Sequence, residues 1–127
     1  MDRLQSFAAV AEALTGAALI ATPSIVGRLL LGVEFSGVTV AVARVAGIAL
    51  VALGVACFSG GEARRGLFGM LTYSLLATLY LVYLGLGGEW VGSLLWPAAV
   101  IHAVLTLLLA IAWVKNRQVK GTKVHSA

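Results

Sequence analysis

The stretch VTVAVARVAGIALVALGVACF, residues 38–58, decides the fold class of this chain. Apart from Thr39 and Arg44, its residues are apolar or glycine. About twenty residues of α-helix cover a hydrocarbon core of about 30 Å. The stretch is therefore predicted to cross a membrane as a helix, with Arg44 as a permanent charge inside it.

The composition extends this interpretation to the whole chain. Its 127 residues are 61% hydrophobic and only 11% charged. A soluble domain is about a quarter charged, because its surface faces water. We therefore expect one integral membrane domain over residues 1–127, with no room for a soluble module. The net charge of +4 does not indicate nucleic-acid binding, because the basic residues lie at the ends of the apolar segments.

Four apolar segments predict four membrane spans. Pro23 ends the first span, and Pro97 is a first-turn proline of the fourth. Between the first two spans, PSIVGRLLLG predicts a short interfacial helix capped by Ser24. The connections are short, which favours an all-α, up-down-up-down four-helix bundle. The spans are expected at about 4–22, 38–58, 67–87 and 97–114, followed by a polar, frayed tail at 115–127.

The basic residues predict the orientation. Seven of the nine Lys and Arg residues fall in the N-terminus, the second connection and the C-terminus. Positive charge near span ends marks the cytoplasmic side, so both termini are expected in the cytoplasm and the protein in the inner membrane. Tryptophan favours the headgroup region, and three tryptophans are predicted to anchor the spans there: Trp90, Trp96 and Trp113.

Small residues in the first two spans predict close packing of these helices against neighbouring helices. Ala9, Ala13 and Ala17 recur every four residues in the first span, and Gly47 and Gly54 lie seven apart in the second. Such positions let helix backbones approach closely in lipid.

The polar residues inside the spans are the candidates for function. A charge at the bilayer centre costs ~2.5 to 3.5 kcal/mol on insertion scales, so these residues are expected to face the bundle interior. Counting from the span ends puts Glu12 in the cytoplasmic layer, and Arg44 with His102 in the opposite layer. Glu12 and Arg44 are then ~12 Å apart in depth. They pair only if the spans tilt; a bridging water or tyrosine is the alternative.

Other polar residues extend these positions into a seam through the bundle. Tyr73 and Tyr80 are seven apart and share a helix face, Tyr83 follows three later, and Thr106 lies four after His102. A structural alternative is that this network fixes helix register and that Arg44 snorkels to the interface. The predicted ligand-binding or polar network is Glu12, Arg44, Tyr73, Tyr80, Tyr83, His102 and Thr106.

The same residues argue against several chemistries. A metal site needs three or four converging ligands, and the spans hold one histidine and one acid. The single cysteine, Cys57, has no partner for an internal disulfide and no base placed near it. No residue is assigned a catalytic role. The sequence requires no cofactor, and a lipid or a quinone is the expected ligand class.

Two family resemblances follow from these motifs. The order TPSIVGRLLLG, ARVAGIALVALGVA and a tyrosine-rich third span resembles the DoxX-like four-helix membrane proteins. That resemblance implies the fold, and some members are small subunits of quinone-linked oxidoreductases. AEALTGA, which contains Glu12, resembles the AE-x-x-G-T pattern of small multidrug-resistance transporters. It implies that Glu12 is an essential membrane acid, although Arg44 is foreign to that family.

Three functional hypotheses remain open at this point. The first is a non-catalytic accessory or scaffold subunit that contacts the bilayer and either other membrane subunits or further copies of itself. The second is a proton-coupled transporter or channel centred on Glu12. The third is a membrane enzyme subunit that binds quinone through His102 and Tyr80.

Overall fold

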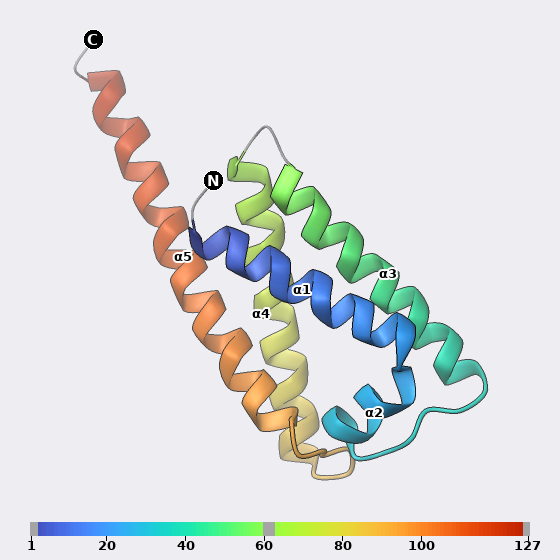
Figure 1. Cartoon of the computed structure of the whole chain (residues 1–127). Helices are drawn as coiled ribbons and strands as arrows, with labels where there is room; N and C mark the ends of the chain where they lie inside the picture. Colours follow the sequence, from blue (N-terminus) through green and yellow to red (C-terminus); the bar gives the residue numbers. More distant parts are fainter. Residues whose placement is uncertain (1–2, 60–62, 126–127) are drawn as a thin grey trace.

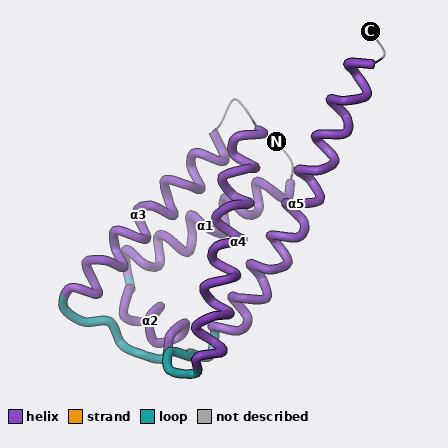
Figure 2. The backbone as a smooth tube through the Cα atoms, turned by 180° about the vertical axis from the view of Figure 1, so that it is seen from behind, coloured by secondary structure: helices purple, strands orange, loops and turns teal. Residues whose placement is uncertain are grey.

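The computed structural model describes residues 3–59 and 63–125, which form five helices and no strand (Figures 1 and 2). Four of the helices are long and apolar enough to cross a membrane. The predicted all-helical fold with four apolar helices is therefore confirmed. The helices are α1 (Arg3–Ala21), α2 (Pro23–Leu31), α3 (Val38–Ser59), α4 (Ala63–Gly87) and α5 (Leu95–His125).

The helix bounds follow the predicted spans closely, except at α4 and α5. α4 begins at Ala63, before the predicted residue 67, and α5 begins two residues before Pro97. Residues 115–125, predicted as a polar tail, continue α5 beyond the rest of the bundle (Figure 1). Lysine, arginine and glutamine are good helix formers, so loss of hydrophobicity does not end this helix. α3 ends at Ser59, one residue beyond the predicted end of the second span, and the last two residues of the predicted tail lie outside the described residues.

Prolines mark two helix boundaries, and α1 ends just before Pro23, as predicted. Pro23 is the first residue of α2, and Pro97 lies in the first turn of α5. The prediction that Ser24 caps α2 is wrong, because Thr22 occupies the cap position. The Ser24 hydroxyl instead donates a hydrogen bond to the Phe35 carbonyl, at 2.9 Å. This bond holds the α2–α3 connection against α2.

α1 and α3 pack through glycines at backbone contact. A Cβ on Gly16 would lie 2.5 Å from the Gly47 carbonyl oxygen, and one on Gly54 would lie 2.6 Å from that of Ala9. The predicted small-residue packing is present, with one difference. Ala17 is exposed, and Gly16 takes its place facing α3. The helical phase explains this, since Gly16 lies seven residues after Ala9.

The bundle consists of two tightly packed helix pairs. α1 packs most extensively on α3, and α4 on α5, whereas contacts between the pairs are fewer. The pairs meet in a buried apolar cluster toward the start of α1 and the end of α3. This cluster contains Ala8, Ala9, Cys57, Leu67, Met70, Leu105 and Leu109.

The opposite end is closed by α2, which is fastened to the α4–α5 connection (Figure 2). The backbone N–H of Gly92 donates to the Leu30 carbonyl at 3.0 Å, and that of Leu94 donates to Leu29 at 2.7 Å. A side chain at Gly92 would collide with the Leu29 carbonyl, so this approach requires glycine. α2 thereby caps the space between the two pairs.

Candidate functional site

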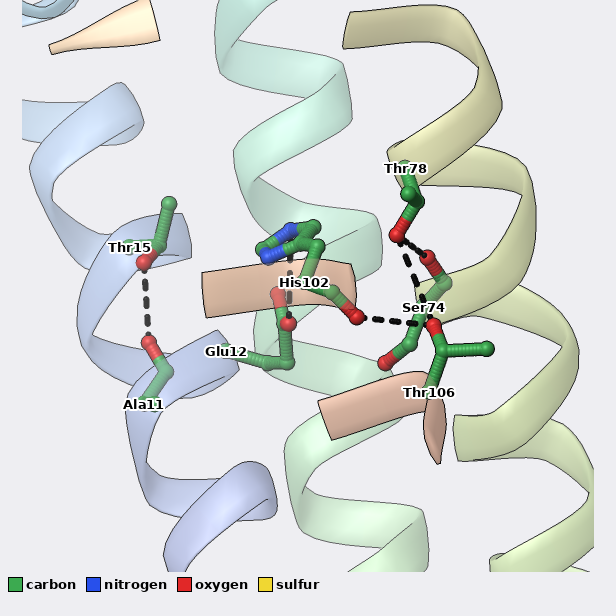
Figure 3. Close-up of polar contacts among 7 residues, drawn as sticks. All are labelled: Ala11, Glu12, Thr15, Ser74, Thr78, His102 and Thr106. Atoms are coloured by element: carbon green, nitrogen blue, oxygen red, sulfur yellow. Dashed lines mark hydrogen bonds and ion pairs between the residues drawn. The ribbon is translucent and has the colours of Figure 1, made fainter. Parts of the chain in front are cut away.

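Glu12 lies at the middle of α1 and is 2% exposed. Its side chain points across the bundle toward His102 of α5 (Figure 3). The carboxylate Oε1 lies 3.9 Å from Nε2 of the imidazole. The most buried acid of the described chain therefore faces the one histidine within the apolar part of the spans.

Tyr73 of α4 completes a group of three titratable side chains. Its side chain lies next to the Glu12 carboxylate and lines the same cavity. Its ring also meets the imidazole of His102 edge-on, with centroids 5.9 Å apart and an interplanar angle of 61°. One acid, one phenol and one imidazole thus converge from three helices, which belong to both helix pairs.

Three buried polar atoms near this group lack a hydrogen bond to any described residue. They are Oε2 of Glu12, Nδ1 of His102 and Oγ of Ser74. A buried polar atom left without a partner costs ~1 to 3 kcal/mol, so native structures rarely keep several together. Unused hydrogen-bonding capacity is typical of a site that binds a further polar group.

Threonines next to the site tie α4 to α5. Thr106 donates to the His102 carbonyl at 2.7 Å, and Thr78 donates to the Ser74 carbonyl at 2.7 Å (Figure 3). The two threonine hydroxyls lie 3.4 Å apart. Thr106 is therefore engaged in helix packing and contributes to the site through the backbone of His102.

A cavity of about 650 Å³ opens beside Glu12, between the two helix pairs. Apart from Glu12 and His102, its lining is mostly aliphatic and aromatic. Leu105 belongs both to this lining and to the buried apolar cluster, so the cluster forms one end of the cavity. Val26 and Leu30 of α2 close the other end. The volume suits a small organic molecule or part of a lipid.

The predicted separation of Glu12 and His102 in depth is wrong. Counting from span ends put them in different layers, yet their side chains are in contact. Glu12 lies at the centre of its 19-residue helix, and α5 begins before Pro97. Glu12 and His102 therefore both lie nearer the middle of their helices than counting from the predicted span ends indicated. α1 also crosses the other helices at an angle (Figure 1).

The prediction that Arg44 faces the bundle interior is wrong. Arg44 is exposed and forms no hydrogen bond or ion pair with a described residue. α3 presents only a narrow face to the bundle, and Ala43 lies on that face. Arg44 is the next residue, and one residue of α-helix rotates the side chain by about 100°, so Arg44 points away from the bundle. The buried positions of α3 are Ala43, Gly47, Leu50, Gly54 and Cys57.

The remaining predicted tyrosines lie outside the group of Glu12, Tyr73 and His102. Tyr80 is 62% exposed and lines the cavity, whereas Tyr83 is 71% exposed and does not. Their rings stack on each other at 6.4 Å between centroids. The predicted seam is thus limited to Glu12, Tyr73 and His102, with Thr106 behind them.

The three predicted anchor tryptophans occupy different settings. Trp90, in the α4–α5 connection, lines a second cavity, and Trp96 packs on Gly85. Trp113 lies between the guanidinium groups of Arg64 and Arg117, at 5.1 and 5.5 Å from its ring centroid. Such cation–π contacts favour an interfacial position for Trp113.

Sequence reasoning missed Ser74 and Phe35. Ser74 is fully buried beside the threonine contacts, and its spacing of four residues from Thr78 was the available signal. Phe35 lines the cavity from a non-helical segment, for which periodicity gives no signal. The described residues contain no group of three or more side chains suited to a metal ion.

Comparisons with known protein families, with curated proteins and with solved structures find no match to this chain. The resemblances to DoxX-like proteins and to small multidrug-resistance transporters therefore stay predictions.

Proposed function

We propose that this protein binds a lipid-soluble molecule in the cavity beside Glu12, Tyr73 and His102, as a non-catalytic subunit of the inner membrane. The observation that carries the proposal is the pairing of unused buried polar atoms on Glu12 and His102 with an otherwise apolar cavity. Ligand sites are mostly apolar, with a few converging polar groups that fix the orientation of the ligand.

The membrane setting is part of this proposal. Four long apolar helices and the basic residues at Arg64, Arg65 and along the end of α5 support an up-down-up-down bundle with both termini in the cytoplasm. In this orientation, α2 and the α4–α5 connection lie at the outer face, and the cavity occupies the outer half of the bundle.

The chemistry of the site indicates the ligand class. The expected ligand has an apolar body and carries a hydroxyl or carbonyl group that reaches Glu12 and His102. A carboxylate oxygen accepts a hydrogen bond, and an imidazole nitrogen donates or accepts according to its tautomer. A quinone or a lipid with a small polar head meets this description, which agrees with the role that the DoxX-like resemblance implies.

Mass spectrometry of small molecules retained by the purified protein tests the proposal. The wild-type protein, isolated in mild detergent, is expected to retain a lipid or quinone. Glu12→Gln is expected to lose most of it, while the exposed-loop control Glu89→Gln retains it. Equal retention by both variants at equal folded yield would refute the site.

A proton-coupled transporter centred on Glu12 is the second proposed function. It is favoured by the position of Glu12, which joins two separately packed helix pairs across a cavity. Movement of one pair relative to the other would change which side the cavity faces. In proteoliposomes, Glu12→Gln would then abolish uptake driven by a pH gradient, while uptake by Glu89→Gln stays normal.

A further inference from the structure

A second cavity of about 580 Å³ lies at the end of the bundle that α2 caps. Its lining includes the exposed polar residues Glu34, Ser36 and Thr39, from the α2–α3 connection and the start of α3, together with Trp90. The cavity beside Glu12 has no such polar rim. The second cavity is therefore the more polar of the two and the nearer to the end of the helices.

The two cavities share part of their walls. Leu30 of α2, Phe35 of the α2–α3 connection, and Tyr80 and Leu81 of α4 line both of them. Only these side chains are common to the two linings, so they form the partition between the cavities. Three chain segments, all at the end that α2 caps, contribute to it.

Phe35 is the part of this partition with the least backbone support. It lies between Gly32 and Gly37, both with positive φ, in a segment without helical hydrogen bonds. Its ring rests on Gly27, where a Cβ would come within 2.7 Å of it. Its carbonyl is held by the Ser24 hydroxyl. The ring thus packs on Gly27, while the hydrogen bond from Ser24 holds the backbone of Phe35.

Tyr80 is the second aromatic side chain common to both linings. It belongs to the regular part of α4, and its ring is 62% exposed and stacked on Tyr83. Rotation of this ring about its side-chain bonds needs no change in the backbone. The two aromatic rings common to both linings are therefore carried by different elements, Phe35 by a loop and Tyr80 by a helix.

We propose that the second cavity is the vestibule of the ligand site, and that its ligand passes between Phe35 and Tyr80 to reach Glu12. This inference rests on the proposed binding function and adds its route of access. It also narrows the ligand class to amphiphiles whose polar group finds hydrogen-bond partners first at Glu34, Ser36 and Thr39, and then at Glu12. The competing route runs sideways from the lipid, past the exposed cavity-lining residues Phe7 and Ile101.

Cysteine accessibility tests this route without knowledge of the ligand. In a Cys57→Ala background, Ala77→Cys places a thiol in the inner cavity beyond the partition. Leu79→Cys, also on α4 but outside both linings, is the lipid-facing control. Glu89→Cys and Thr122→Cys mark the two ends of the bundle. A charged, membrane-impermeant methanethiosulfonate is added to proteoliposomes, and labelling is followed over time.

We expect Ala77→Cys to react with reagent on the same side as Glu89→Cys, while Leu79→Cys stays unreactive. Adding Phe35→Ala should accelerate labelling of Ala77→Cys about tenfold, and Ser36→Trp should slow it by a similar factor. Phe35→Leu, which keeps more of the packing, serves as a second variant and should give an intermediate rate. Folding of each variant is checked by its thermal transition in detergent.

Two results would overturn the vestibule. One is labelling of Ala77→Cys at a rate that Phe35→Ala, Phe35→Leu and Ser36→Trp leave unchanged. The other is labelling only by a membrane-permeant thiol reagent, which would favour the sideways route from the lipid. Because no ligand is involved, either result leaves the retention test of Glu12→Gln to decide the binding function separately.

Discussion

Glu12 and His102 depend on each other, because each is a buried polar group with few other partners. We expect His102→Leu to destabilise the protein by ~1 to 3 kcal/mol, since the Glu12 carboxyl group loses a partner in an apolar setting. Glu12→Leu should cost less when His102→Leu is already present. A double-mutant cycle of unfolding free energies in detergent should give a coupling of ~0.5 to 3 kcal/mol.

The matched control for this cycle is Thr15→Val, which changes a polar residue of α1 that lines the cavity away from the imidazole. It should show no coupling to His102→Leu. Strict additivity of Glu12→Leu and His102→Leu would mean that the 3.9 Å approach contributes nothing to folding.

Arg44 provides the opposite case at the residue scale. It projects from the outer side of α3 and forms no hydrogen bond or ion pair with a described residue. Arg44→Leu should therefore change the unfolding free energy in detergent by no more than ~0.5 kcal/mol, as for most surface substitutions. A loss of several kcal/mol would show that Arg44 has a partner within the bundle.

Glu12 and Arg44 show what the sequence can and cannot predict about the site. Rarity of charge in an apolar segment drew attention to both Glu12 and Arg44, and of the two only Glu12 faces the bundle interior. The difference between them is helical phase, which depends on which face of each helix is packed. α3 is apolar on all sides, so its sequence contains no amphipathic pattern from which that face could be predicted.

At the scale of elements, the contact of α1 with α3 depends on missing side chains. A Cβ on Gly47 would lie 2.6 Å from the Gly16 carbonyl oxygen, which belongs to the backbone and cannot move aside. We expect Gly47→Ala to lower the unfolding free energy by ~1 to 3 kcal/mol through overpacking. Thermal unfolding in detergent measures the effect.

Gly69→Ala is the control, because a Cβ on this glycine of α4 meets nothing within 4 Å. It should leave stability unchanged or raise it by up to ~1 kcal/mol, since alanine favours the helix more than glycine does. Equal effects of the two substitutions would contradict the proposed backbone contact between α1 and α3.

The existence of these elements was predictable, whereas their exact ends and partners were not. Pro23 correctly marked the end of the first span, and Pro97 the first turn of α5, because proline restricts the backbone whatever surrounds it. The helical extension to His125 was missed, because a span prediction follows hydrophobicity and α5 continues after its apolar part ends. The convergence of Glu12, Tyr73 and His102 depends on helix crossing, which spacing along one helix does not encode.

At the scale of the whole molecule, the chain consists of two helix pairs that have fewer contacts with each other than within themselves. Each pair has its most extensive contacts inside itself. Contacts between the pairs include the buried cluster, the approach of Glu12 to His102, and the backbone hydrogen bonds between α2 and residues 92–94. A chain divided within residues 60–62 should therefore give two pieces that find each other in the membrane.

Co-expression of residues 1–60 and 62–127 with an affinity tag on the second piece measures this association. We expect the untagged piece to co-purify, and Met70→Ala, which removes a fully buried side chain from the shared cluster, to reduce the recovered amount. Such a truncation costs ~2 to 5 kcal/mol when the space does not collapse. Leu79→Ala, on the exposed side of the same helix, should leave recovery unchanged. If the pieces never associate, or if both substitutions act alike, the shared cluster does not join the pairs.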